Sequence, residues 1–395
     1  MKKVLFVVPS MVSFGGVEKL LVTLAQLLEE DFVINIASFD RFGATPCFPT
    51  AAHFYPLGQC KNWPLPFRFI TYIGTARRLA ALKKVISPDL TVSLLWRADL
   101  MNALTKQKKE KIASLAVINI VNNKSNLLLM RFAGIVGVVY RRFHRILAIT
   151  PLILEEFKSL YNIDPERLSI FRTFVHPERQ VAKLSDNSSR FVFCGRAVHE
   201  KNIEGLLYVF RLFSERHHGR QLVIIGDGPL LCSMILLAEE LGLSVSTDSN
   251  SKAQVLFVGS RETPECFMWG ARAFLLTSRH EGLPTVLILA AALGLPFLAA
   301  DSEGGGVRYL LSQTTSQLGC FREGTSFDLS ESHLPVPDPK KPITLELWVQ
   351  AIELIEFNIS FRNNLIKLSS EISKIYSRES VKAEWLSFVN LMVNQ

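Results

Sequence analysis

The sequence lacks several features that would assign it to a common class. Its six cysteines are scattered, with no C-x-x-C pair. No apolar run reaches the roughly 18 residues that a membrane-spanning helix needs, and the nearest, 127–140, is interrupted by Arg131. Asp-x-Asp metal motifs, His/Cys clusters and a G-x-S-x-G elbow are also absent. These absences disfavour a disulfide scaffold, an integral membrane protein, a metal site and a serine hydrolase.

The N-terminus predicts no secretory leader. Lys2 and Lys3 precede only five apolar residues before Pro9, which is too short for a signal-peptide core. Together with the cysteine pattern, this favours a reduced, cytoplasmic compartment. We expect the protein to associate peripherally with the inner face of the cytoplasmic membrane.

Charge is distributed unevenly along the 395 residues. Residues 1–175 hold 23 Lys and Arg against 12 Asp and Glu, a net +11, whereas the remainder has 21 against 24, a net −3. The N-terminal half therefore favours an anionic partner such as a membrane surface. Its basic clusters at 77–84 and 141–145 are candidates for that surface, although a buried helix with a solvated end explains them equally well. No aromatic-interleaved RNA motif accompanies the charge, so nucleic acid is disfavoured.

Strands alternate with helices along the chain, which predicts an α/β fold of two Rossmann-like, doubly wound parallel-sheet domains facing a cleft. We expect an N-terminal domain (1–175) that faces the membrane, a C-terminal domain (189–375), and a last helix (376–395) that returns to the first domain. The polar stretch 173–189 is the expected linker. Expected strands include 4–8, 32–37, 90–94, 115–121 and 146–149; expected helices include 70–84, 126–145, 152–161, 345–365 and 381–393.

The C-terminal half contains four short apolar strands, each followed by a turn that opens a helix. They read FVFCGRAVHEKN from Phe191, LVIIGDGP from Leu222, LFVGS from Leu256 and LLTSRHEGLP from Leu275. Such turns present backbone N–H groups and a helix dipole to an anion. Arg196 and Lys201 add cations, and Glu281 adds an acceptor for hydroxyl groups. This combination predicts a diphosphate carrying a hydroxyl-rich group, that is, a nucleotide-sugar.

Each motif also has a plainer explanation. Gly15-Gly16 after the first strand lacks a full G-x-G-x-x-G, so a nicotinamide cofactor is disfavoured and an ordinary strand–helix turn is an alternative. Arg196 and Lys201 are alternatively solvated surface cations, and Glu281 a helix-capping acid. Residues 226–229 are mostly structural, and the glycines at 304–306 also suit a flexible loop.

Together, these motifs resemble the family-4 glycosyltransferases, which have the GT-B fold. The resemblance covers about 191–310 in order and spacing, and extends less specifically to GGVEK and to PDLTVSLLWRADLMNA from Pro88. It implies a retaining, metal-independent hexosyltransferase. Such an enzyme moves sugar from a nucleotide-diphosphate donor to a glycan or lipid-linked acceptor of lipopolysaccharide, capsule or a related envelope glycan. No cofactor is expected beyond the donor.

The resemblance also implies that 1–175 is the acceptor-side domain and that 189–375 is the nucleotide-sugar-binding domain. It implies roles for single residues as well. Arg196 and Lys201 neutralise the leaving diphosphate and Glu281 holds sugar hydroxyls, so these three are the candidate catalytic residues. The acceptor-side candidates are Trp96 and Asn122, the latter standing where the family often has a His. The donor-side candidates are Gly15, Gly16, Val258, Gly259, Arg261, Gly282, Leu283, Pro284, Leu289, Gly305 and Gly306.

Besides Asn122, two further positions depart from the family pattern. Leu289 stands where the family usually has a second Glu that contacts ribose, and Tyr309 follows Arg308 where a Glu is usual. A degenerate GT-B protein that binds a nucleotide-sugar or a partner without efficient transfer is therefore an alternative. A nucleotide-sugar epimerase is another, but no acid/base pair for it is evident.

Overall fold

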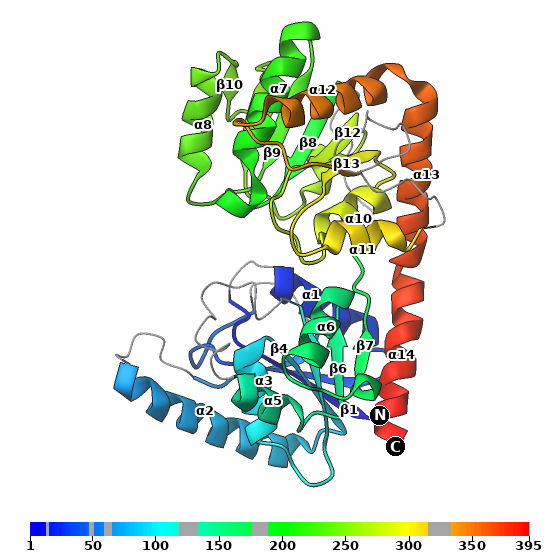
Figure 1. Cartoon of the computed structure of the whole chain (residues 1–395). Helices are drawn as coiled ribbons and strands as arrows, with labels where there is room; N and C mark the ends of the chain where they lie inside the picture. Colours follow the sequence, from blue (N-terminus) through cyan, green and yellow to red (C-terminus); the bar gives the residue numbers. More distant parts are fainter. Residues whose placement is uncertain are drawn as a thin grey trace. The chain divides into compact units, whose positions relative to one another are not determined.

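The computed structural model describes residues 1–12, 16–46, 51–58, 65–117, 133–175, 189–314 and 333–394. The chain divides into two compact units (Figure 1). Unit 1 comprises Met1–Phe174 with Arg378–Gln395, and unit 2 comprises Val175–Ser377. The final helix, expected to return to the first domain, therefore belongs to unit 1.

Unit 1 is built on a seven-stranded sheet in the order β3-β2-β1-β4-β5-β6-β7, in which every pairing is parallel. Residues 4–8 of its first strand are all buried, as expected where helices cover both faces of a parallel sheet. The strands are β1 (Lys3–Val8), β2 (Val33–Ser38), β3 (His53–Pro56), β4 (Leu90–Leu94), β5 (Lys111–Ala116), β6 (Arg145–Ala148) and β7 (Leu168–Ile170).

The helices of unit 1 cover this sheet, and α14 completes its core. Trp385 of α14 is almost fully buried, and its ring lies 4.2 Å from the ring of Phe171 and 6.5 Å from that of Phe6. The helices are α1 (Gly16–Leu28), α2 (Leu65–Ile86), α3 (Trp96–Leu104), α5 (Ala133–Tyr140), α6 (Pro151–Ser159), a 3₁₀ turn (Pro165–Arg167) and α14 (Arg378–Asn394).

Unit 2 repeats the architecture, with strand order β10-β11-β9-β8-β12-β13-β14 and only parallel pairings. Both sheets therefore have the doubly wound form that the sequence predicts. The strands are β8 (Arg190–Cys194), β9 (Gln221–Ile225), β10 (Val245–Ser246), β11 (Val255–Gly259), β12 (Ala273–Leu276), β13 (Phe297–Ala300) and β14 (His333–Leu334).

Helices surround the unit 2 sheet, with α7 packing on α12 and α10 packing on α13 (Figure 1). They are a 3₁₀ turn (His199–Lys201), α7 (Ile203–Arg216), α8 (Leu231–Glu240), α9 (Glu265–Met268), α10 (Thr285–Ala292), α11 (Gly306–Ser312), α12 (Pro342–Phe357) and α13 (Ile359–Ile375).

Some expected boundaries are wrong. The strand expected at 115–121 is β5, which begins at Lys111 and ends at Ala116, because its backbone pairs in register with β4 from Leu90 onward. The single helix expected at 345–365 is two helices. Asn358 separates them, and its side chain accepts a hydrogen bond from the backbone N–H of Phe361, which starts α13.

Part of the expected basic surface on α2 is also wrong. Lys83 is fully buried, and its ammonium lies 2.8 Å from the Glu110 carboxylate and 2.7 Å from Oδ1 of Asn102. Burial lowers the pKa of Lys83, and Glu110 opposes this shift. Arg78 donates to the backbone carbonyl of Gly58 at 2.7 Å. These two cations hold unit 1 together and are not available to a membrane surface.

The core of unit 1 contains a buried carboxyl group on α3. Asp99 is 1% exposed and accepts hydrogen bonds from the hydroxyls of Ser93, at 2.7 Å, and Tyr140, at 2.8 Å. Burial raises the pKa of Asp99 to about 7, against the opposing effect of these hydrogen bonds. The folded protein therefore holds this proton more tightly than the unfolded chain does.

We predict that Asp99→Asn changes how stability depends on pH. The unfolded Asp titrates near pH 4 and the folded one near pH 7. Between these values, the wild-type free energy of unfolding should fall by about 1.4 kcal/mol per pH unit relative to the variant, and the difference should level off above pH 7. Urea unfolding of both proteins from pH 4.5 to 8 measures this slope. A difference that stays constant across the range would contradict the prediction.

Candidate functional site

The carboxyl ends of the unit 2 strands gather most of the residues expected at the site. In a parallel sheet these ends share one edge, and ligands bind there at the point where strand order reverses. In unit 2 that point lies between β8 and β12, which are neighbours in the sheet although 80 residues separate their following loops at Lys201 and Glu281. The structure thus places these loops side by side.

Lys201 and Glu281 form an ion pair at this point. The Lys201 ammonium lies 2.6 Å from Oε1 of Glu281, with 24% of the lysine side chain and 8% of the glutamate side chain exposed. Oε2 of Glu281 forms no hydrogen bond with any described residue. An ammonium has three N–H donors, so the pair retains donors for an anion and an acceptor oxygen for hydroxyl groups.

Asn202 fixes the geometry of this pair. Its backbone is left-handed (φ 51°) and its side chain is buried. Oδ1 accepts from the guanidinium of Arg279 at 2.7 Å and from the backbone N–H of Gly205 at 3.4 Å. Nδ2 donates to the carbonyls of Thr277, at 3.1 Å, and Pro337, at 2.9 Å. The sequence did not assign a role to Asn202 or Arg279.

Glycines allow the loops to approach each other closely. A Cβ on Gly226 would lie 2.0 Å from the carbonyl oxygen of Gly195, and one on Gly306 would lie 1.6 Å from that of Gly282. Gly305, which precedes α11, has φ +69°. Backbone packing alone therefore requires these glycines, whether or not a phosphate also contacts the loops.

Arg196 and Arg261 are exposed side chains on this edge. Arg196 forms no hydrogen bond or ion pair with the described residues, so its five donors are available. The Arg261 guanidinium, expected to stack on a nucleotide base, lies 5.5 Å from the ring centroid of Phe267. Val258 is buried in β11, and Gly259 adopts φ +70° where that strand ends.

Leu289 lies in the core of unit 2. The helix that carries it, α10, begins at Thr285. Leu289 is 4% exposed on this helix, which packs against α13. Leu283 and Pro284, which precede the helix, are buried as well. Position 289 therefore serves packing rather than hydrogen bonding.

The expected site residues of unit 1 are only partly described. Gly15 and Asn122 lie outside the described residues, and Gly16 is the first residue of α1. Trp96 opens α3 at the carboxyl end of β4, with its ring 5.8 Å from that of Tyr140. The preceding Leu95 has φ 72°, a strained conformation for a non-glycine residue that sequence reasoning missed.

Two buried hydroxyls near Glu281 were also missed. Ser278 follows β12 and Ser302 follows β13, and neither Oγ atom has a hydrogen-bond partner among the described residues. A buried hydroxyl without a partner is unfavourable, so both are candidates to bind a ligand or water. In the sequence, nothing distinguishes them from other serines that follow strands.

Among the described residues, no three His, Cys, Asp or Glu side chains are grouped in a way that could hold a metal ion. The helices of the same ranges include none with the length and apolar composition that a membrane span requires.

We predict that Leu289→Glu destabilises unit 2. The new carboxylate would be buried without a partner, which costs about 3–5 kcal/mol and roughly 6–20 °C in Tm. Leu289→Met conserves volume and should cost less than about 1.5 kcal/mol. Thermal melting of both variants tests this; an unchanged Tm for Leu289→Glu would show that position 289 reaches solvent.

The comparisons with known proteins agree with this fold. Residues 175–316 match the family model "Glycosyl transferases group 1". The crystal structure of HepE from Anabaena in complex with UDP and glucose matches 99% of this chain and 100% of its own, with a TM-score of 0.71 and 14% identity. Such low identity shows the fold alone.

Two curated relatives illustrate the sequence matches. An uncharacterized glycosyltransferase of Methanocaldococcus jannaschii is 28% identical over 128 residues, which cover 32% of this chain and 30% of the relative. An α-1,4-N-acetyl-D-galactosaminyltransferase of Campylobacter jejuni, whose name gives a PP-undecaprenol-linked glycan, is 24% identical over 98% of both chains. In three local matches the chain spans only 19–30% of the relative's length. The chain is thus similar to glycosyltransferases, with a GT-B fold and a glycosyl transferases group 1 match centred on unit 2.

Proposed function

We propose that the protein is a retaining glycosyltransferase that moves a hexose-type sugar from a nucleotide-diphosphate donor to a glycan or lipid-linked acceptor of the cell envelope. The observation that carries this proposal is the Lys201–Glu281 pair, held at the strand-order reversal of unit 2. A donor sugar with its diphosphate presents hydroxyls and anionic oxygens together. The Glu281 carboxylate can accept hydrogen bonds from the sugar hydroxyls, and the Lys201 ammonium can donate to the anionic oxygens of the diphosphate.

The proposed reaction exchanges one bond at the anomeric carbon for another. The bond from this carbon to the leaving phosphate oxygen breaks, and a bond to the acceptor oxygen forms on the same face. The acceptor hydroxyl proton passes to the leaving phosphate. Arg196 and Lys201 stabilise the negative charge that develops on the diphosphate, which is commonly the largest catalytic contribution. Glu281 orients the sugar through its hydroxyls, and Asn202 positions the pair.

The names of similar proteins support the substrate classes. The HepE structure contains UDP and glucose. The name of the C. jejuni relative describes an acceptor linked to diphosphoundecaprenol. A lipid-linked acceptor would bring this protein to the inner face of the cytoplasmic membrane, where we propose that it associates peripherally.

We predict that Arg196→Gln lowers turnover by about 10²–10³, by analogy with the loss of one donor in an oxyanion hole. The Tm should be unchanged, because the Arg196 side chain is exposed and forms no hydrogen bond with the described residues. Arg211→Gln is the matched control, since Arg211 is an exposed arginine on α7 that pairs with Glu215. A transfer assay across several nucleotide-sugars measures both variants.

Two results would redirect the proposal. Equal turnover in wild type and Arg196→Gln would remove Arg196 from the catalytic machinery. Donor binding by the wild type, detected as a raised Tm, without transfer to any acceptor would instead favour a degenerate GT-B protein. Leu289, buried where the family usually has a Glu, is the observation that keeps this alternative in view.

We also propose that transfer is metal-independent, since Arg196 and Lys201 supply the positive charge that a divalent cation would otherwise provide. EDTA should leave the turnover of the wild type within about twofold, whereas loss of activity on chelation and its recovery with magnesium would reject this part of the proposal.

A further inference from the structure

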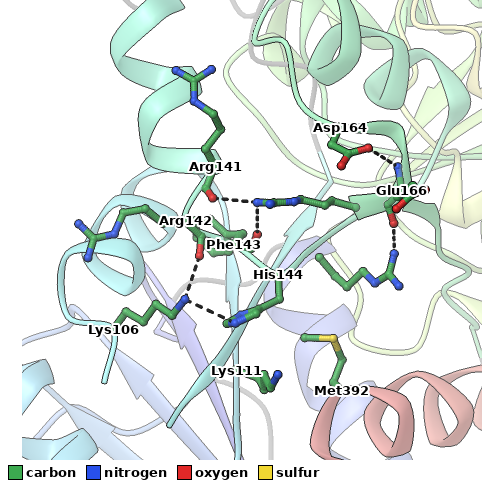
Figure 2. Close-up of a pocket in the computed structure, with 11 residues that line it drawn as sticks. Lys106, Lys111, Arg141, Arg142, Phe143, His144, Asp164, Glu166 and Met392 are labelled. Atoms are coloured by element: carbon green, nitrogen blue, oxygen red, sulfur yellow. Dashed lines mark hydrogen bonds between the residues drawn. The ribbon is translucent and has the colours of Figure 1, made fainter. Parts of the chain in front are cut away.

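Unit 1 has a concentration of charged side chains that is separate from the candidate site of unit 2. These side chains lie at the amino ends of the unit 1 strands, opposite to their carboxyl ends. A cavity of about 640 Å³ opens at the amino ends of β5, β6 and β7 (Figure 2). Its lining includes Lys111, the first residue of β5, Arg145, the first of β6, and Arg167, just before β7. This volume lies in the range of small-molecule sites.

The lining is strongly cationic. Six lysines and arginines face only two acids, Asp164 and Glu166. The cations are Lys106, Lys111, Arg141, Arg142, Arg145 and Arg167. Within the described ranges, none of the six forms an ion pair with a carboxylate, and Asp164 instead accepts from the backbone N–H of Glu166 at 3.0 Å. The positive charge of the cavity is therefore largely uncompensated.

Three of the cations shape the walls through backbone contacts. Arg167 donates to the carbonyl of Arg141 at 3.0 Å, Arg145 donates to the carbonyl of Glu166, and Lys106 donates to that of Arg142 at 3.4 Å (Figure 2). These bonds join the turn after α5 to the loops before β5 and β7. The walls are thus tied together without a ligand.

The remaining cations have free charged groups. The side chains of Lys111, Arg141 and Arg142 form no hydrogen bond with the described residues, and Figure 2 shows the two guanidinium groups extending from the turn. His144 lies beside Lys106, with Nε2 3.5 Å from the Lys106 ammonium. Burial lowers the pKa of His144, and Lys106 and Lys111 act in the same direction. Burial also lowers the pKa of Lys106, and the charges of Arg142, Lys111 and Arg167 lower it further. These cations therefore repel Lys106, and an anion would relieve that repulsion.

We propose that this cavity is an anion site, distinct from the donor site of unit 2, that binds a ligand carrying clustered phosphate groups. Arginine matches phosphate oxygens with paired N–H donors, and lysine adds a mobile point charge. Because several cations surround one cavity, a ligand with several phosphate groups fits it better than a ligand with a single phosphate group. Soluble polyphosphates and the phosphorylated headgroups of lipids share this chemistry.

The test uses tripolyphosphate as the probe, titrated calorimetrically into the full-length protein at 150 mM salt. Lys111→Gln/Arg142→Gln removes two charged groups that form no hydrogen bond or ion pair with the described residues. This variant should weaken binding at least about tenfold. Lys108→Gln/Lys109→Gln removes the same charge from exposed lysines outside the cavity and should change binding less than about twofold. All titrations are repeated in the Arg196→Gln background, which weakens phosphate binding at the donor site, so that binding at the unit 1 cavity is measured with less interference.

Vesicles distinguish the two sources of phosphate. If the ligand is a headgroup, the protein should co-sediment with phosphatidylglycerol-containing vesicles but not with pure phosphatidylcholine. Tripolyphosphate and Lys111→Gln/Arg142→Gln should then both reduce co-sedimentation. If the ligand is soluble, Lys111→Gln/Arg142→Gln should lose tripolyphosphate binding without changing co-sedimentation. Absence of tripolyphosphate binding, or equal weakening by both variant pairs, would overturn the proposal.

Discussion

The candidate site of unit 2 depends on one buried amide. The Asn202 side chain forms hydrogen bonds with four groups from three segments. One group lies on its own helix, two lie on the loop after β12, and one lies on the segment before α12. Its left-handed backbone turns the chain from the Lys201 loop into α7. Asparagine tolerates this conformation better than most residues. A side chain without both a donor and an acceptor could not make these contacts.

The hydrogen bonds of Asn202 hold two loops rigidly in place, and these loops carry the less constrained ion pair of Lys201 and Glu281. Asn202 follows Lys201 directly, and it bonds to the loop that carries Glu281. Gly205 allows the Pro337 segment to come close, since a Cβ there would lie 2.5 Å from the Pro337 carbonyl. The ion pair therefore meets across two loops whose separation is set by buried hydrogen bonds. Preorganisation of this kind keeps charged groups in position before substrate arrives.

Sequence reasoning identified both sheets because buried parallel strands read as continuous apolar runs, as in β1 and β9. It also located Lys201 and Glu281 through their turns. It missed short edge strands such as β3, of which three residues are half-buried and one is exposed. Contacts that depend on three dimensions, such as those of Asn202 with Thr277 and Pro337, leave no local pattern to read.

The different environments of the basic residues show why the charge of the sequence alone could not locate an anion site. Lys83 and Arg78 are basic residues of α2, yet burial and backbone carbonyls make them structural. Lys111 and Arg142 are 31 residues apart in sequence, but the parallel register of β5 and β6 brings their neighbourhoods to one cavity. Net charge predicts that a domain attracts anions. Where an anion would bind depends on which cations the fold brings together without carboxylate partners, and the six cations of the unit 1 cavity are such a group.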